Sequence, residues 1–161
     1  MAIGVGDRLP EGTFTQITEN GPAPVTTNDI FSGKKVILFG VPGAFTPACH
    51  KTHLPGYVEQ FDAIKAKGVD TIACLSVNDA FVLDAWAKAT GAAGKVLMLA
   101  DGNADYTKKL GLDLDLSGFG LGTRSKRFSA IVEDGQVKEL NIEEAAGKVT
   151  SSGADATLCQ L

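Results

Sequence analysis

Cysteine is scarce in this sequence, and positive charge is not in excess. Only three of the 161 residues are cysteines, an odd and sparse set that does not fit a secreted disulfide scaffold and favours a reducing compartment. The 15 lysines and arginines are outnumbered by 19 aspartates and glutamates, which gives a net charge of −4 at pH 7. Because no basic surplus is available to displace phosphate counterions, we do not expect nucleic acid as the main partner.

Long apolar runs are also missing. The best one, at residues 36–41, is far shorter than the roughly 20 residues that a membrane-spanning helix needs, so no membrane association is expected. The first residues show no basic stretch followed by an apolar segment, which is the pattern of a signal peptide. We therefore expect a cytoplasmic protein.

The composition is that of an ordinary globular domain. Apolar residues make up 44% and charged residues 21% of the chain, close to the average for such domains. This apolar content can offset the conformational entropy lost on folding, which excludes a disordered chain. The length suits one hydrophobic core, so residues 1–161 are predicted to form a single domain.

Strand and helix patterns alternate along the chain. They predict strands at 34–40, 69–77 and 96–99, helices from Pro47 to Gly68, from Asp79 to Gly91, at 104–110 and at 154–161, and a hairpin of 127–132 with 136–140 around Asp134-Gly135. This order predicts an α/β fold with a central mixed sheet and helices on both faces. The glycines at 118, 120 and 122 lack the spacing of a dinucleotide-binding motif and favour a loop, with a ligand-binding loop as the alternative.

The segment from Val41 to Cys49 leaves a buried strand, turns, and opens a helix. Thr46 suits the N-cap and Pro47 the first helical position, so Cys49 falls in the first turn. There, free backbone N–H groups and the helix dipole favour the thiolate, the nucleophilic form of cysteine. The alternative is that Cys49 is only a small core residue at a helix start.

This segment also carries a family signature. Pro42, Thr46 and Cys49 match the Pro-x-x-x-Thr-x-x-Cys pattern of peroxiredoxins, which are thiol peroxidases with a thioredoxin-like fold. The longer string Gly-Val-Pro-Gly-Ala-Phe-Thr-Pro-Ala-Cys-His-Lys-Thr-His-Leu-Pro-Gly resembles the type II, peroxiredoxin-five-like subfamily, as do residues 73–81 and 124–129. The resemblance implies a thioredoxin-like fold with an N-terminal β-hairpin extension, no cofactor, and the reduction of hydrogen peroxide and organic hydroperoxides.

The resemblance also implies roles for four residues. Cys49 attacks the peroxide and becomes a sulfenic acid. Cleavage of the O–O bond places negative charge on the leaving oxygen, so the site must hold the peroxide and receive that charge. Thr46 can direct its hydroxyl at the peroxide or the sulfur, and Arg127 can offer fixed N–H donors to both, although by pattern alone Arg127 would be a surface residue. Pro42 is implied to shield the sulfenic acid from further oxidation.

Two histidines near Cys49 raise the question of a metal site. His53 lies one helical turn after Cys49 and His50 directly follows it, but zinc needs three or four ligands and no other cysteine or histidine stands at motif spacing. We therefore expect no metal. His53 matches a histidine common in the subfamily, where it is implied to orient backbone near the site, and His50 is expected to be exposed.

The thiol that reduces the sulfenic acid is left open by the sequence. Cys74 matches a second cysteine of many type II members, but its strand-like setting favours an inert core thiol. Animal members have a resolving cysteine where this chain has Ser151, while Cys159 follows near the carboxyl terminus and could reach Cys49 within the chain or across a dimer. The favoured route is external, through glutathione or a glutaredoxin, with thioredoxin as the rival.

The sequence also bears on other functions and on the assembly state. A thioredoxin-like disulfide reductase would need Cys-x-x-Cys, and Thr46 occupies the first of those positions. A redox relay or peroxide sensor that passes oxidation to client proteins is the alternative from another class. Phe45 in the loop before Cys49, together with apolar residues near Phe81, predicts a homodimer interface; the alternative is that Phe45 folds back under its own loop.

Overall fold

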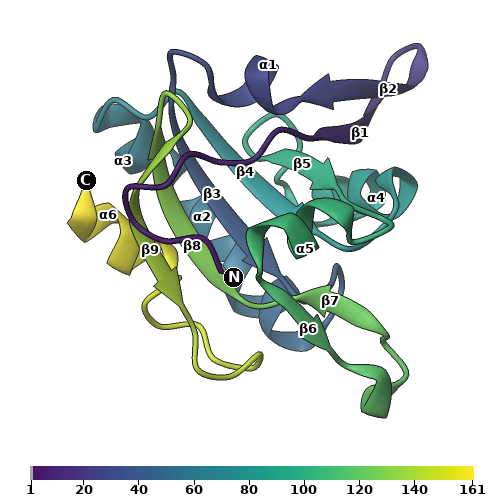
Figure 1. Cartoon of the computed structure of the whole chain (residues 1–161). Helices are drawn as coiled ribbons and strands as arrows, with labels where there is room; N and C mark the ends of the chain where they lie inside the picture. Colours follow the sequence, from purple (N-terminus) through teal and green to yellow (C-terminus); the bar gives the residue numbers. More distant parts are fainter. Residues whose placement is uncertain (1) are drawn as a thin grey trace.

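A mixed β-sheet runs through the molecule (Figure 1). The computed structural model describes residues 2–161. The main sheet has seven strands in the order β2-β1-β5-β4-β3-β8-β9. They are β1 (Thr13–Thr18), β2 (Gly21–Thr26), β3 (Lys35–Val41), β4 (Thr71–Ser76), β5 (Leu97–Ala100), β8 (Phe128–Glu133) and β9 (Gln136–Ile142). Strands β3, β4 and β5 pair in parallel, whereas β1 pairs with β2 and β5, and β8 pairs with β3 and β9, in antiparallel fashion. The expected mixed sheet and N-terminal hairpin are confirmed.

Helices cover both faces of the sheet, as predicted. One hydrophobic core includes residues of α1 (Thr27–Phe31) and α5 (Asp105–Leu110), and the other includes residues of α2 (Leu54–Glu59), α3 (Phe61–Ala66), α4 (Ala80–Thr90) and α6 (Ala154–Gln160). Strand β3 serves both cores, because Val36 and Leu38 belong to the first while Ile37 and Phe39 belong to the second. The continuous apolar run is therefore a central strand buried on both faces.

Helix α4 has the predicted ends. Asp79 accepts the N–H of Val82 at 2.8 Å, and Gly91 ends the helix in the left-handed region at φ 74°. The buried positions include Leu83 and Trp86, whereas Phe81 is 66% exposed. The apolar spacing therefore located the helix, and Phe81 lies outside the face that packs on the core.

The single helix predicted from Pro47 to Gly68 is divided into segments. It begins at Pro47 and widens into a π-helical turn, η1 (Cys49–His53), which α2 and α3 follow. In this turn the N–H of Leu54 reaches back to the carbonyl of Cys49. Pro55 comes next and has no N–H to continue the α-helical ladder, which explains why the regular pattern is lost here.

The second half of the chain completes the sheet and adds a separate ribbon. Asp134 and Gly135 adopt positive φ values of 48° and 77°, as expected for the two-residue turn between β8 and β9. Strands β6 (Asp113–Asp115) and β7 (Thr123–Ser125) form a two-stranded ribbon. The glycine cluster lies in the segment between them, which includes the short helix η2 (Ser117–Phe119). In Figure 1 this ribbon projects from the lower right of the molecule.

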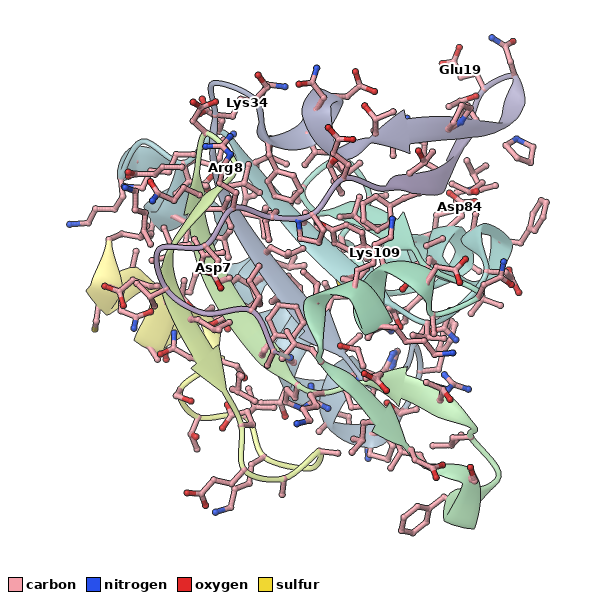
Figure 2. The ribbon with its side chains drawn as sticks, in the orientation of Figure 1. Asp7, Arg8, Glu19, Lys34, Asp84 and Lys109 are labelled. Carbon is pink, nitrogen blue, oxygen red and sulfur yellow. The ribbon has the colours of Figure 1, made fainter. Side chains whose placement is uncertain are left out.

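Polar contacts fasten the N-terminal segment across the fold. The guanidinium of Arg8 donates to the carbonyl of Asp134 at 3.0 Å, and Lys109 donates to the carbonyl of Glu11 at 2.9 Å. Figure 2 shows Arg8 and Lys109 along this segment, on the outside of the sheet. Within residues 2–161, no helix is both long enough and apolar enough to cross a bilayer.

Candidate active site

The loop between β3 and the first helical turn is fixed to the carboxyl end of β4. The N–H of Ala44 donates to Oδ1 of Asn78 at 3.0 Å, and the same oxygen accepts the hydroxyl of Ser76 at 2.6 Å. Ser76 ends β4, so two adjacent parallel strands place this loop at one edge of the sheet. This edge, at the carboxyl ends of parallel strands, is where α/β folds place ligand sites.

Thr46 stands at the start of the helix but does not cap it with its side chain. The N–H of His50 donates to the carbonyl of Thr46 at 2.8 Å, so Thr46 occupies the N-cap position and Cys49 lies in the first turn, as predicted. The Thr46 hydroxyl instead donates to the carbonyl of Gly43 at 2.6 Å. The expected side-chain cap is therefore wrong, because the tight loop brings a carbonyl closer to the hydroxyl than the helix N–H groups.

Cys49 meets Arg127 in the interior of the protein. Nη2 of Arg127 donates to Sγ of Cys49 at 3.0 Å. Cys49 is 0% and Arg127 only 2% exposed, so their contact is shielded from water. Arg127 directly precedes β8, and the antiparallel pairing of β8 with β3 places it beside the segment that leaves β3. The surface position suggested by pattern alone is wrong for this arginine.

Three acceptors hold the guanidinium of Arg127 in one orientation. Besides Cys49, it donates from Nη1 to Nδ1 of His53 at 2.8 Å and from Nε to the carbonyl of Ala146 at 2.8 Å. A planar guanidinium with several fixed N–H donors is well suited to such an arrangement, which a single ammonium group could not satisfy.

The hydrogen bonds of His53 define its protonation state. Arg127 can only donate, so Nδ1 accepts; Nε2 lies 2.9 Å from the carbonyl of Ser152 and must donate its hydrogen. Burial, together with the positive charge of Arg127, lowers the pKa of His53 to about 3. His53 is thus a neutral ring that links Arg127 to backbone, and both of its nitrogens are occupied. No group of three metal-ligating side chains occurs among residues 2–161.

The charge of Arg127 has no carboxylate in direct contact. The ion pairs found within residues 2–161 involve Lys35, Lys88 and Lys148 instead. A buried cation is costly without a counter-charge, and of the three groups that accept from Arg127 only the sulfur of Cys49 can carry a negative charge. The surroundings of Arg127 therefore favour an anion at Sγ.

Comparison with known proteins decides the family. Residues 4–158 match the Redoxin family. Peroxiredoxin-2B of Arabidopsis thaliana is 47% identical over 97% of this chain and 96% of its own length, and the chloroplastic Peroxiredoxin-2E of the same plant is 46% identical over 96% and 68%. Reduced Prx3 of Vibrio vulnificus in complex with H2O2 is 49% identical, with a TM-score of 0.93 and 98% of both chains covered. The chain belongs to the type II peroxiredoxins.

This membership establishes the reaction class. Peroxiredoxins are thiol-dependent peroxidases, so the chain is an oxidoreductase that acts on peroxides, and the redox-relay alternative is not favoured. The thioredoxin-like fold expected from the family resemblance is confirmed as well.

Pro42 and Arg124 border the peroxiredoxin site on the side of the ribbon. Pro42 is buried directly after β3. Its carbonyl accepts Nη1 of Arg124 at 3.4 Å, while Nε of Arg124 donates to the carbonyl of Leu121 at 2.8 Å. The sequence analysis did not single out Arg124 as a separate contact. Its place in the 124–129 block is the only signal that could have indicated it.

The three cysteines have different surroundings, and none forms a disulfide. Cys74 lies in β4 and is fully buried, and burial, with a smaller contribution from the nearby Cys49, raises the pKa of its thiol well above the usual value. Cys159 lies in α6 and is exposed. Ser151, at the position of the animal resolving cysteine, is exposed just before α6.

His50 is not the free surface residue that the sequence suggested. It is half-buried, and its Nδ1 accepts the indole N–H of Trp86 at 3.1 Å. The ring of Phe45 stacks on His50 with centroids 5.5 Å apart, yet Phe45 remains 49% exposed. The error arose because Trp86 reaches His50 from α4, a contact between residues that are distant in sequence.

Proposed function

We propose that Cys49 is the peroxidatic cysteine of this peroxiredoxin and that Arg127 is the residue that activates it. The observation that supports this most strongly is the 3.0 Å contact between Nη2 of Arg127 and Sγ of Cys49 in a buried setting. A positive charge held there favours the thiolate, and it also lies where negative charge develops on the leaving oxygen.

The proposed reaction is a displacement at oxygen. The Cys49 thiolate attacks one peroxide oxygen, an S–O bond forms and the O–O bond breaks. The other oxygen leaves with the bonding electron pair and takes up a proton from solvent, giving water or an alcohol. Sulfur is thereby oxidised to a sulfenic acid and the peroxide is reduced.

Thr46 and Pro42 assist this step in our proposal. The Thr46 hydroxyl donates to the carbonyl of Gly43 at 2.6 Å, and in our proposal it donates to a peroxide bound beside Cys49 instead. Pro42 is buried at the end of β3 and has no N–H to bind water. It would therefore limit the approach of a second peroxide to the sulfenic acid.

We propose an external thiol as reductant. The buried Cys74 has a raised pKa and is a poor nucleophile, and Cys159 lies in α6 rather than in the loop before it. Glutathione or a glutaredoxin is favoured over thioredoxin. Because Cys49 is 0% exposed, such a thiol requires the first helical turn to open. Mass spectrometry under non-reducing conditions, after one equivalent of peroxide in the presence of glutathione, distinguishes the routes: a glutathione adduct on Cys49 supports this proposal, and a Cys49–Cys159 or Cys49–Cys74 disulfide contradicts it.

We further propose a cytoplasmic homodimer in which each chain is one domain. Phe45 adopts φ 63°, an unfavourable conformation for a bulky residue, and it remains half-exposed beside the active-site loop. Phe81 is exposed at the start of α4, the helix whose Trp86 lies 6.4 Å from the Phe45 ring. Pairing of two copies through this surface would bury both aromatic rings.

The assignment of Cys49 is tested with two matched variants. Cys49→Ser is expected to abolish peroxide turnover in a protein that still folds, as checked by circular dichroism, because oxygen replaces sulfur with little change in the shape of the side chain. Cys74→Ser changes the same atom in the same core and is expected to keep most of the activity. Substantial turnover in Cys49→Ser would contradict the proposal.

A further inference from the structure

The loop between β9 and α6, residues 143–153, packs little apolar surface against the core, although it supplies two hydrogen-bond acceptors to the active site. The carbonyl of Ala146 accepts from Arg127, and the carbonyl of Ser152 accepts from both His53 and Tyr57. Between residues 144 and 151 no residue is fully buried. Hydrophobic packing therefore does not explain what holds the carbonyl of Ala146 in place, whereas Ser152 is buried just before α6.

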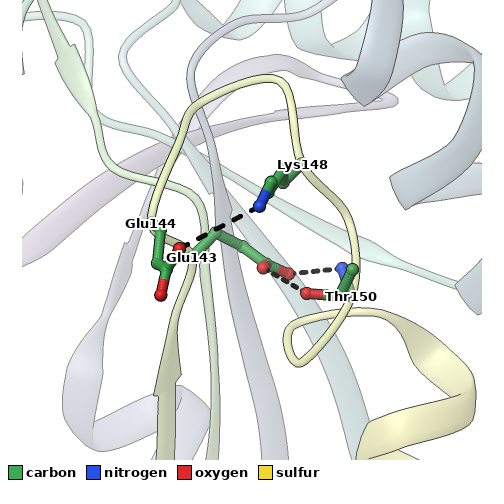
Figure 3. Close-up of polar contacts among 4 residues, drawn as sticks. All are labelled: Glu143, Glu144, Lys148 and Thr150. Carbon is green, nitrogen blue, oxygen red and sulfur yellow. Dashed lines mark hydrogen bonds and ion pairs between the residues drawn. The ribbon is translucent and has the colours of Figure 1, made fainter.

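Glu143 stands at the entrance of this loop and reaches across it. Its carboxylate accepts the N–H of Thr150 at 2.6 Å and the Thr150 hydroxyl at 2.7 Å, and likewise the N–H of Ser152 at 2.9 Å and the Ser152 hydroxyl at 2.5 Å. We call these four hydrogen bonds the Glu143 clamp. Figure 3 shows Glu143 directed across the loop to Thr150, while Glu144 is paired with Lys148.

The clamp is connected to the active site at both ends. At the entrance, the N–H of Glu143 donates to the carbonyl of Arg127 at 2.9 Å, so the two residues are directly adjacent. At the exit, Ser152 offers its N–H and hydroxyl to Glu143 and its carbonyl to His53. His53 in turn accepts from Nη1 of Arg127, and Nη2 of the same guanidinium donates to Sγ of Cys49.

The ionised carboxylate suits this position. Glu143 is only 8% exposed. Burial by itself raises its pKa, but the hydrogen bonds from Ser152 and Thr150 outweigh burial and lower the pKa of Glu143 to about 2. Three of the four donors point to Oε2, and only the Thr150 hydroxyl points to Oε1. A glutamine could keep this pattern only with uncharged hydrogen bonds, its NH2 group donating to the Thr150 hydroxyl, and such bonds are about half as strong as those to a carboxylate.

We propose that Glu143 is a positioning residue for catalysis: its clamp fixes the loop that holds Arg127 and His53, and thereby directs Arg127 onto Cys49. Glu143 touches neither sulfur nor substrate and acts only through Arg127. This inference rests on the proposed role of Arg127. It concerns a residue that the sequence analysis did not single out.

The test compares Glu143→Gln with Glu144→Gln. Both variants remove one negative charge from adjacent residues, but Glu144 is exposed and its carboxylate forms an ion pair with Lys148 at 3.9 Å. The measurement is the second-order rate of Cys49 oxidation by hydrogen peroxide, taken where each variant is fully folded by circular dichroism. Since loss of an electrostatic donor slows catalysis by about 100- to 1000-fold, we expect a misdirected Arg127 to slow Glu143→Gln by at least about tenfold, and Glu144→Gln to stay within about twofold.

A second comparison separates positioning from a purely structural role. Alkylation of Cys49 by iodoacetamide needs the thiolate but no stabilised leaving oxygen, so Glu143→Gln should slow peroxide oxidation more than alkylation. In an Arg127→Ala background, Glu143→Gln should slow oxidation by no more than about twofold further, because its effect passes through Arg127. If Glu143→Gln fails to fold, Thr150→Val removes one clamp hydroxyl and should show the same dependence on Arg127, with a smaller effect.

The possible failures point to different causes. A wild-type peroxide rate in Glu143→Gln, or equal slowing in Glu143→Gln and Glu144→Gln, overturns the clamp alone. The clamp is also overturned if Glu143→Gln slows Cys49 oxidation in the Arg127→Ala background as much as it does in the wild-type background. If Arg127→Ala itself reacts at the wild-type rate, the role of Arg127 fails, and the clamp fails with it.

Discussion

Removal of Arg127 is the most informative perturbation of this peroxiredoxin. In Arg127→Ala the Cys49 sulfur loses its 3.0 Å donor, and Nδ1 of His53 and the carbonyl of Ala146 lose donors at 2.8 Å. Loss of one preorganised donor to developing charge costs about 2.7–4 kcal/mol. Since each 1.36 kcal/mol is a factor of ten, the rate of peroxide attack is expected to fall roughly 100- to 1000-fold.

Arg127→Lys divides this loss into its parts. Lysine keeps the positive charge but presents one compact ammonium group, which cannot hold sulfur, imidazole and carbonyl at once. Its rate is expected to lie between those of wild type and Arg127→Ala. Lys126→Ala serves as the control, because it removes the same charge from the neighbouring position and should leave the rate nearly unchanged.

The assay is stopped-flow fluorescence of the single tryptophan. Trp86 donates to His50, which directly follows Cys49, so its emission should respond to oxidation of the sulfur. Each variant is mixed with excess hydrogen peroxide, and the second-order rate is taken from the concentration dependence. A rate for Arg127→Ala within about threefold of wild type would refute the electrostatic argument.

Three further results are expected. Phe45→Asp should weaken the homodimer, because a carboxylate at a buried interface would lack a partner; sedimentation equilibrium at micromolar concentration checks this, and a wild-type monomer would contradict it. In folded Cys49→Ser, an alkylating reagent followed by mass spectrometry should modify the exposed Cys159 readily and the buried Cys74 hardly at all; equal labelling would argue against an inert Cys74. Because the pKa of His53 is lowered to about 3, the unfolded chain binds a proton below pH 6.5 that the folded protein does not bind. As the pH is lowered from 6.5 to 3, the free energy of unfolding should therefore fall by up to about 1.4 kcal/mol per pH unit. Urea titrations of His53→Asn should show a weaker dependence of this free energy on pH.

The sequence by itself was sufficient for several of the main elements and for the chemical class. The alternation of a continuous apolar strand with helical spacing located β3 and α4, and Asp134-Gly135 located the β8–β9 turn. These predictions succeed because they depend on residues close together in the chain. The position of Cys49 in a first helical turn is local in the same sense, since Thr46 and Pro47 define the helix start.

The tertiary structure decided how the site is held together. Arg127 reaches Cys49 across 78 positions of sequence, and His53 meets Ser152 across 99. No periodicity records such contacts, because they arise only when β8 pairs with β3 and the loop after β9 folds back. The same reason explains why the partner of His50 and the Glu143 clamp were not predicted. A local pattern shows which residue can react, whereas the hydrogen bonds that fix its neighbours depend on strand order and on the path of a loop.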